Sequence, residues 1–156
     1  MRAIDAIRRR PVSIPADWTI ADAARRMDEA GIGAVVVVDG DEPVGIVTDR
    51  DLVVRGIARK VPPDARIDAV MTSELVTLPA NADVREAFKI FHSRPLRRIP
   101  IVDEGRLAGM VTADDLLIDL VGDLAALTRP ITGQVIWGAS ARTDSLPVAA
   151  AGTPRK

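Results

Sequence analysis

Cysteine is absent from the 156 residues of this chain, and aromatic side chains are scarce at 3%. The first absence excludes disulfide bonds and thiolate metal sites, and it is compatible with a reducing compartment. The second requires an aliphatic core, because hydrophobic residues still make up 47% of the sequence. The single histidine, His92, has no acidic or cysteine partner at ligand spacing, so we expect no metal site.

An excess of charge of one sign is also missing. The chain has 21 basic and 22 acidic residues and a formal net charge of −1, whereas a general nucleic-acid binder carries a basic excess. No stretch approaches the ~20 apolar residues of a membrane span. Arg8–Arg10 interrupt the N-terminal region, where a secretion signal would need an apolar run. We therefore expect a soluble, cytoplasmic protein with neither a membrane partner nor a specific nucleic-acid partner.

The sequence does contain a repeat. The phrase GIVTDRDL at Gly45–Leu52 returns 64 residues later as GMVTADDL at Gly109–Leu116. The match extends without a gap, aligning Val12–Ile57 with Val76–Val121. A gapless match of this length indicates a structural duplication.

Each copy predicts the order strand, helix, strand, strand, helix. Thr19 with Asp22, and Asp83 with Glu86, have the spacing of an N-cap residue followed by an acid three positions later, which is typical of a helix start. The continuously apolar run AVVVVD at residues 34–39 is typical of a strand buried on both faces. Each copy therefore combines helices with a small sheet.

A copy of about 46 residues is too short to bury both faces of such a sheet alone. We therefore predict an α+β fold in which two pseudo-symmetric β-α-β-β-α repeats pack sheet to sheet. The first repeat with its N-terminal segment spans residues 1–62, and the second repeat spans residues 63–127. Residues 128–156 form a C-terminal tail that we expect to be mostly mobile, with QVIW at Gln134–Trp137 as a candidate docking strand.

The repeated phrase has two interpretations. Thr48 with Asp51, and Thr112 with Asp115, have capping-box spacing, and each cap would contribute about 1 kcal/mol to stability. A strand that ends just before a helix also gathers free N–H donors that attract phosphate. An aspartate in the first helical turn offers two acceptor oxygens to the hydroxyls of a ribose. The spacing alone is compatible with both a helix start and a nucleoside-phosphate site.

The tandem segments VSIP…AVVVVD…PVGIVTDRDL and VTLP…RRIPIVD…LAGMVTADDL resemble a pair of CBS domains, or Bateman module, over about Ile4–Val121. The resemblance implies two clefts between the repeats that bind adenosine-containing ligands such as AMP, ADP, ATP, NAD or S-adenosylmethionine, none of them obligatory. It also implies a homodimer formed through the helices. The apolar stripes that could serve both core and partner comprise Leu52, Val53, Ile57, Leu116, Leu117, Leu120 and Val121.

The resemblance also implies which residues line the clefts. Its pattern places Thr48 and Thr112 near phosphate, Asp51 and Asp115 at ribose, Val12, Ile32, Val76 and Leu96 at adenine, and Ala34, Arg50, Arg97, Arg98 and Asp114 at the strand and helix entries. The two clefts are not equivalent, because Arg97 and Arg98 in the second repeat correspond to Gly33 and Ala34 in the first. Asp114 would repel a phosphate unless a cation or Arg97 intervened.

No Ser–His–Asp set, P-loop or pair of buried carboxylates is visible, so we expect a protein that is not an enzyme. The first hypothesis is a stand-alone sensor of adenosine-containing ligands that regulates an unknown partner protein. The alternative is a structural or protein-interaction module that keeps the same fold but binds no nucleotide. A third and weaker hypothesis is an enzyme that acts on a nucleotide.

Overall fold

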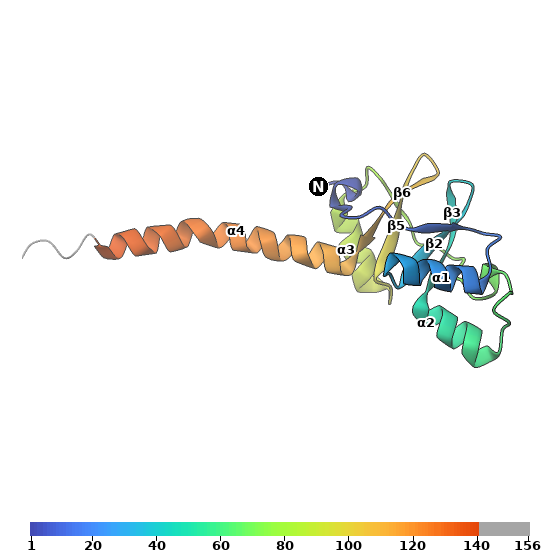
Figure 1. Ribbon diagram of the computed structural model, residues 1–156. Helices are drawn as coiled ribbons and strands as arrows, with labels where there is room; N and C mark the ends of the chain where they lie inside the picture. The colour runs from blue at the N-terminus through green and yellow to red at the C-terminus, as the bar shows by residue number, and fades with distance from the viewer. Residues whose placement is uncertain (141–156) are drawn as a thin grey trace, which may run out of the picture. The chain divides into compact units, whose positions relative to one another are not determined.

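The computed structural model describes the backbone of residues 1–140 and the side chains of residues 1–127. Residues 1–116 form one compact unit that holds two three-stranded sheets, and the helical residues from Leu117 onward belong to a second unit (Figure 1). The first sheet contains β1 (Ser13–Pro15), β2 (Ala34–Asp39) and β3 (Glu42–Thr48). The second contains β4 (Leu78–Pro79), β5 (Arg98–Asp103) and β6 (Arg106–Thr112).

Helices and helical turns connect these strands. The two longer helices beside the sheets are α1 (Ile20–Ala30) and α3 (Val84–Ser93). The short α2 (Asp49–Asp51) continues as a π-helical turn η2 (Leu52–Gly56) and a 3-10 turn η3 (Ile57–Arg59). Two further 3-10 turns, η1 (Ala3–Ala6) and η4 (Ile67–Ala69), precede the sheets, and α4 spans Ala113–Ser140. The predicted α+β fold is confirmed.

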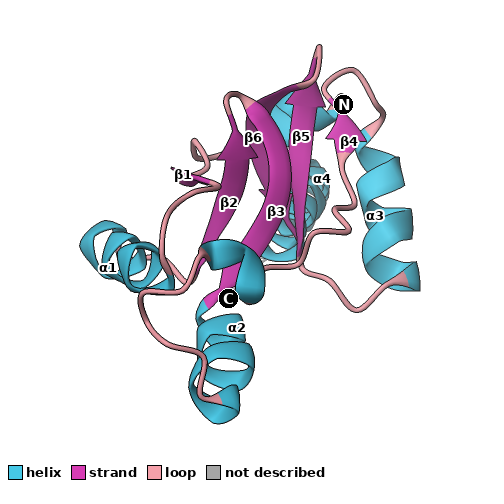
Figure 2. Cartoon of the chain, turned by 90° about the vertical axis from the view of Figure 1, so that its right-hand side faces the viewer, coloured by secondary structure: helices cyan, strands magenta, loops and turns pink. Residues whose placement is uncertain are grey.

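The two sheets have the same internal register, which agrees with the duplication read from the sequence. In each sheet the first strand is parallel to the second, and the second is antiparallel to the third. Ala34 pairs with Thr48 as Arg98 pairs with Thr112, and the register shifts after Val37 in one sheet and after Ile101 in the other. Figure 2 shows the long strands of both sheets side by side, with α1 and α3 on opposite outer sides.

The two predicted helix starts differ in detail. Thr19 and Asp22 form the expected capping box at α1: the Asp22 amide donates to Thr19 Oγ1 at 3.1 Å, and the Thr19 amide donates to Asp22 Oδ2 at 3.2 Å. At α3, Asp83 accepts from the amide and the guanidinium of Arg85, and the guanidinium contact measures 2.8 Å. The predicted helix start at Asp83 is confirmed, because the Asp83 carboxylate accepts from the Arg85 amide.

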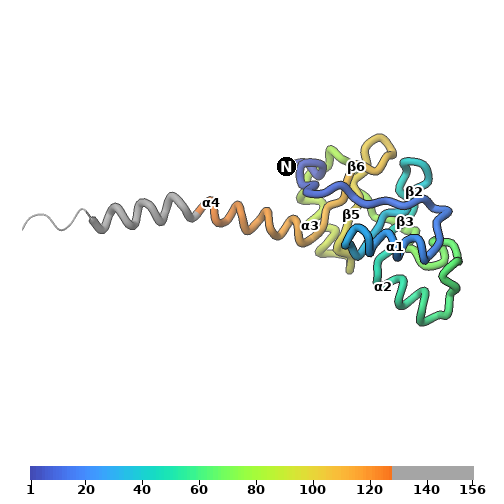
Figure 3. Tube along the Cα trace, viewed as in Figure 1, coloured from blue at the N-terminus to red at the C-terminus, as the bar shows by residue number. Residues whose placement is uncertain are grey.

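The hydrophobic cores exchange segments between the repeats. Turn η1 packs into the core of the second sheet, where the Ala3 amide donates to the Ala82 carbonyl at 2.7 Å. Turn η4 packs into the core of the first sheet, where the Ile67 amide donates to the Trp18 carbonyl at 2.9 Å. Figure 3 shows the dark-blue N-terminal turn beside α3 and β6, far along the chain. The segment preceding each repeat therefore completes the core of the other repeat.

Two glycines allow these crossing segments to approach the sheets. A Cβ at Gly45 in β3 would collide with Met71 Sδ, and a Cβ at Gly109 in β6 would collide with Ile7 Cδ1 and lie 2.7 Å from Ile7 Cγ1. Both positions are buried. The repeated glycine is thus a close-packing position on the last strand of each sheet, β3 or β6.

The C-terminal helix differs from the sequence-based expectation. Helix α4 runs without a break to Ser140, so Gln134–Trp137 is helical and the expected docking strand is wrong. Once a helix has started, each further residue adds one backbone hydrogen bond, and this outweighs the local β-propensity of Val135 and Ile136. The expected mobile tail beyond residue 140 lies outside the described residues. None of the helices within residues 1–140 is long and apolar enough to cross a membrane.

The close approach at Gly109 generates a stability prediction. We expect Gly109→Ala to lower the free energy of unfolding by about 1–3 kcal/mol, because the new methyl group overpacks the contact with Ile7. Urea unfolding followed by tryptophan fluorescence measures this change. Gly45→Ala should cost less, because the thioether of Met71 can move aside more easily than a β-branched side chain.

A matched control lies in α4, where nothing stands within 4 Å of a Cβ at Gly122. Gly122→Ala should leave stability unchanged or raise it by up to about 1 kcal/mol, as expected for an open helical position. In addition, Ile7→Ala combined with Gly109→Ala should cost less than the sum of the single changes. Strict additivity of the pair would contradict the proposed contact.

Candidate functional site

A cleft between the two repeats opens where β3 passes into α2. Its cavity has a volume of about 420 Å³ and is lined by both repeats, and we call it the Thr48 cleft. Seven of the predicted site residues line it: Thr48, Arg50 and Asp51 from the first repeat, and Val76, Leu96, Arg97 and Arg98 from the second. Further lining comes from Ile46, Asp49, Thr72, Glu74, Leu75, Pro95 and Pro100. The repeated phrase therefore forms one wall, and the strand entries of the other repeat form the opposite wall.

The predicted capping box is present at this wall. Oδ2 of Asp51 accepts hydrogen bonds from the amide and the hydroxyl of Thr48, both at 2.9 Å, while the Asp51 amide donates to Thr48 Oγ1 at 3.2 Å. The other oxygen, Oδ1, lies 3.6 Å from Nε of Arg55. Because the cap uses only Oδ2, capping and ligand binding do not compete for the same oxygen of Asp51.

Side chains of both charges line the Thr48 cleft: Arg50, Arg97 and Arg98 are basic, and Asp49, Asp51 and Glu74 are acidic. Arg97 contributes to its wall, and its guanidinium is paired with Asp114 at 2.5 Å. Arg97 thus neutralises the acid that would otherwise repel a phosphate. Among the side chains described for residues 1–127, those of Arg50 and Arg98 have no ion pair within 4.0 Å, and both residues are exposed. Two cationic groups are therefore available to an anionic ligand.

The pseudo-symmetric counterpart is smaller. Its cavity of about 110 Å³ is lined by Val12, Ile32 and Ala34 from the first repeat and by Met110 and Asp115 from the second, and we call it the Asp115 cleft. Two predicted members of this site, Thr112 and Asp114, do not line the cavity. The Thr112 hydroxyl takes part in the helix cap instead. It donates to Asp115 Oδ2 at 2.7 Å and accepts from the Asp115 amide at 3.0 Å.

Sequence reasoning missed two residues of the Asp115 cleft. Arg9 and Arg10 line it beside Pro11, although the strand-entry positions Gly33 and Ala34 carry no charge. The crossing of the N-terminal segment toward the second sheet brings these arginines to the cleft. The sequence signal for this contact is the basic run Arg8–Arg10, which lies shortly before Val12.

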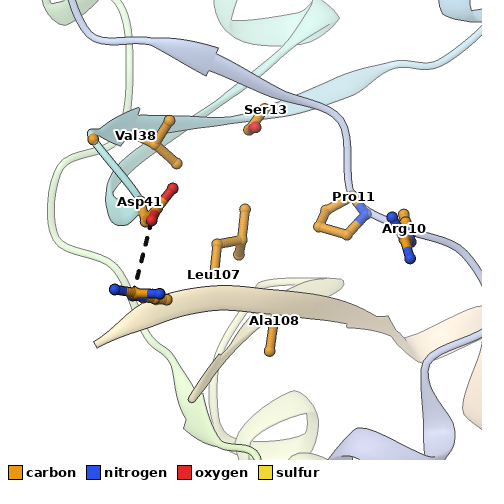
Figure 4. Close-up of a pocket in the computed structure, with 9 residues that line it drawn as sticks. Arg10, Pro11, Ser13, Val38, Asp41, Leu107 and Ala108 are labelled. Carbon is orange, nitrogen blue, oxygen red and sulfur yellow. Dashed lines mark ion pairs between the residues drawn. The ribbon is translucent and has the colours of Figure 1, made fainter. Parts of the chain in front are cut away.

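A different cavity, of about 470 Å³, lies near the β2–β3 and β5–β6 turns (Figure 4). Asp41 and Arg106 face each other across one end, with Oδ2 and Nε 3.8 Å apart, and both side chains are 75% exposed. Pro11, Ser13 and Leu107 line the rest, and none of the predicted site residues takes part. Its open, solvated charges make it a weaker candidate than the Thr48 cleft.

Metal binding has no visible basis in the described part of the chain. No group of three or more His, Asp or Glu side chains within it is arranged to hold a metal ion.

The family assignment follows from comparison with known proteins. The family model described as "CBS domain" matches residues 3–56 and 67–122, which together form most of the chain and coincide with the two repeats. The chain belongs to the CBS-domain family. The predicted resemblance is thus confirmed, and the two clefts lie between the members of a CBS pair.

Curated relatives of this CBS pair include proteins without an assigned role. Uncharacterized protein YlbB of Bacillus subtilis is 46% identical over 99 residues, which cover 62% of this chain and 67% of YlbB. Hypoxic response protein 1 of Mycobacterium tuberculosis is 33% identical over 100 residues, covering 63% of this chain and 70% of that protein. Uncharacterized protein MK0525 of Methanopyrus kandleri is 41% identical, but the match spans only 52% of its length.

Solved structures share the fold. The crystal structure of Hypoxic Response Protein I, with two coordinated zinc ions, has a TM-score of 0.70 at 30% identity and covers 76% of this chain and 98% of that one. The CBS domain protein PAE2072 from Pyrobaculum aerophilum, complexed with AMP, has a TM-score of 0.69 at 24% identity and covers 78% of this chain and 99% of that one. The second likeness shows the fold alone.

Proposed function

We propose that this CBS pair is a regulatory module that binds an adenosine phosphate in the Thr48 cleft and is not itself an enzyme. The observation that carries the proposal is the composition of that single cavity. Asp51, whose Oδ1 is not used by the cap, lines a space of about 420 Å³ together with Arg50, Arg98 and apolar side chains. Small-molecule sites commonly have volumes of roughly 300–1,000 Å³.

Each part of an adenosine phosphate has a chemical counterpart in the cleft. Oδ1 of Asp51 can accept from the ribose hydroxyls while Oδ2 stays in the cap. The guanidinium groups of Arg50 and Arg98 suit phosphate oxygens, which they can contact through paired donors. The apolar side chains that line the cleft, among them Val76 and Leu96, can pack against the adenine ring.

The two clefts support different occupancies. The Asp115 cleft has about 110 Å³, which is well below the ordinary size of a ligand pocket, although Arg9 and Arg10 line it. We therefore propose one nucleotide per chain, bound in the Thr48 cleft. The complex of the Pyrobaculum aerophilum CBS protein with AMP supports the choice of ligand class through the shared fold.

The alternative is an interaction module that binds no nucleotide, and apolar exposure is the observation that favours it. Val53, Val54 and Ile57 are 54%, 44% and 74% exposed, and Leu117, Ile118 and Val121, each 64 residues later, are 57%, 56% and 57% exposed. Leu116 is buried, so it serves the core rather than a partner. We propose that the exposed residues form a homodimer interface, which a nucleotide-binding module can also possess.

The first test of this function concerns Asp51. Isothermal calorimetry with AMP should give one site per chain for the wild type, and Asp51→Asn should lower affinity by about one to two decades, because charge-assisted hydrogen bonds of roughly 1.5–3 kcal/mol are lost. Asp115→Asn is the matched variant from the other cleft and should leave that affinity nearly unchanged. If Asp51→Asn binds AMP with wild-type affinity, the repeated phrase serves only as a helix start. If the wild type binds none of AMP, ATP, NAD and S-adenosylmethionine, the interaction module is favoured.

The second test concerns the phosphate end of the cleft. Arg98→Ala should weaken ATP binding more than adenosine binding, because only the phosphates carry charge for the guanidinium to contact. The free energy of unfolding without ligand should barely change, since an exposed arginine contributes little. Equal weakening of ATP and adenosine, measured by calorimetry, would place Arg98 away from the phosphates.

The third test concerns assembly. Light scattering at micromolar concentration should give twice the 16.7 kDa mass of one chain. Ile57→Asp should shift the protein toward the monomer, because it puts a charge into the proposed apolar interface, whereas Arg59→Gln on the same helical segment should not. A wild-type protein that remains at 16.7 kDa would contradict the homodimer.

A further inference from the structure

Arg55 stands behind the Thr48 cleft and touches both the cleft wall and the connection between the repeats. Its Nε lies 3.6 Å from Asp51 Oδ1, the oxygen that the cap leaves free. Its Nη1 donates to the carbonyls of Val70 and Met71, both at 3.2 Å, and to Thr72 Oγ1 at 3.1 Å. One side chain therefore joins the helix start to a linker segment that lies 15–17 residues further along the chain.

This linker segment, residues 70–72, is itself part of the site. Thr72 lines the Thr48 cleft and is paired with Ile46 of β3: the Thr72 amide donates to the Ile46 carbonyl at 2.9 Å, and the Ile46 amide donates to the Thr72 carbonyl at 3.0 Å. Met71 packs against Gly45, and Val70 lies in the first core. The segment thus fastens the connection between the repeats to the first sheet.

The second repeat has an acidic residue where the first repeat has Arg55. The position equivalent to Arg55 is Asp119, four residues after Asp115 on α4. A carboxylate cannot donate to backbone carbonyls. Asp119 therefore cannot make the donor contacts that Arg55 makes to residues 70–72.

We propose that Arg55 is a positioning residue that holds Asp51 Oδ1 for the ligand and couples the Thr48 cleft to the linker at residues 70–72. Asp51 is then fixed at both oxygens, by Thr48 on one side and by Arg55 on the other. Since coupling between two sites is reciprocal, a ligand that stabilises Asp51 also stabilises Arg55 and the linker carbonyls that it contacts. The ligand-dependent half of this inference rests on the function proposed above.

Hydrogen exchange at the Thr72 amide tests the coupling without any ligand. Arg55→Gln should speed that exchange by about tenfold, because bonds to a charged group are lost from the linker. Asp51→Asn should speed it several-fold when Arg55 is present and not at all in the Arg55→Gln background. Arg59→Gln, which removes an exposed charge from the same helical segment, is the matched control and should leave the exchange unchanged.

Two further measurements separate this inference from the proposed function. Saturating AMP should slow hydrogen exchange at the Thr72 amide in the wild type but not in Arg55→Gln. Arg55→Lys keeps the charge but loses the forked donors of the guanidinium. This variant should therefore retain part of the AMP affinity, while AMP should no longer slow exchange at the Thr72 amide. If AMP fails to bind the wild type, the proposed function fails while the exchange cycle still tests the link. An equal effect of Asp51→Asn with and without Arg55 would overturn the role of Arg55.

Discussion

The contacts of Ile7 with Gly109 and of Met71 with Gly45 hold the two repeats of this CBS pair together. Each contact brings the segment that precedes one repeat against the last strand of the other repeat's sheet, β3 or β6. A Cβ at Gly109 would collide with Ile7, and a Cβ at Gly45 would require the side chain of Met71 to shift. The crossing turns η1 and η4 then complete the two cores, so neither sheet is finished by residues of its own repeat alone.

The composite clefts follow from this crossing. Because the repeats face each other around an approximate twofold axis, the helix start of one repeat meets the strand entry of the other. The Thr48 cleft combines Asp51 with Leu96 and Arg98, and the Asp115 cleft combines Asp115 with Val12 and Ile32. The duplication makes the two walls similar in backbone, while substitutions at a few positions make the clefts differ in charge and size.

Capping and ligand recognition are compatible at Asp51 because a carboxylate has two oxygens. Oδ2 closes the helix start with Thr48, and Oδ1 is left to Arg55 and to the cleft. The same phrase in the second repeat keeps its cap, but an aspartate replaces the arginine that would orient the carboxylate. A repeated motif can therefore preserve its local structure in both copies while the residues around it differ.

The sequence by itself determined the features that depend on neighbours along the chain. These are the duplication, the strands at residues 34–39 and 98–103, and the Thr19 and Thr48 caps, all of which arise from side-chain periodicity or from contacts three residues apart. One local expectation was wrong, because Gln134–Trp137 continue a helix. Only the tertiary structure decided which residues of the two repeats face each other across a cleft. It also placed Arg9 and Arg10 at the Asp115 cleft and Arg55 between Asp51 and the linker segment. Those contacts join residues far apart in the chain, so no spacing or composition could reveal them before the crossing segments were placed.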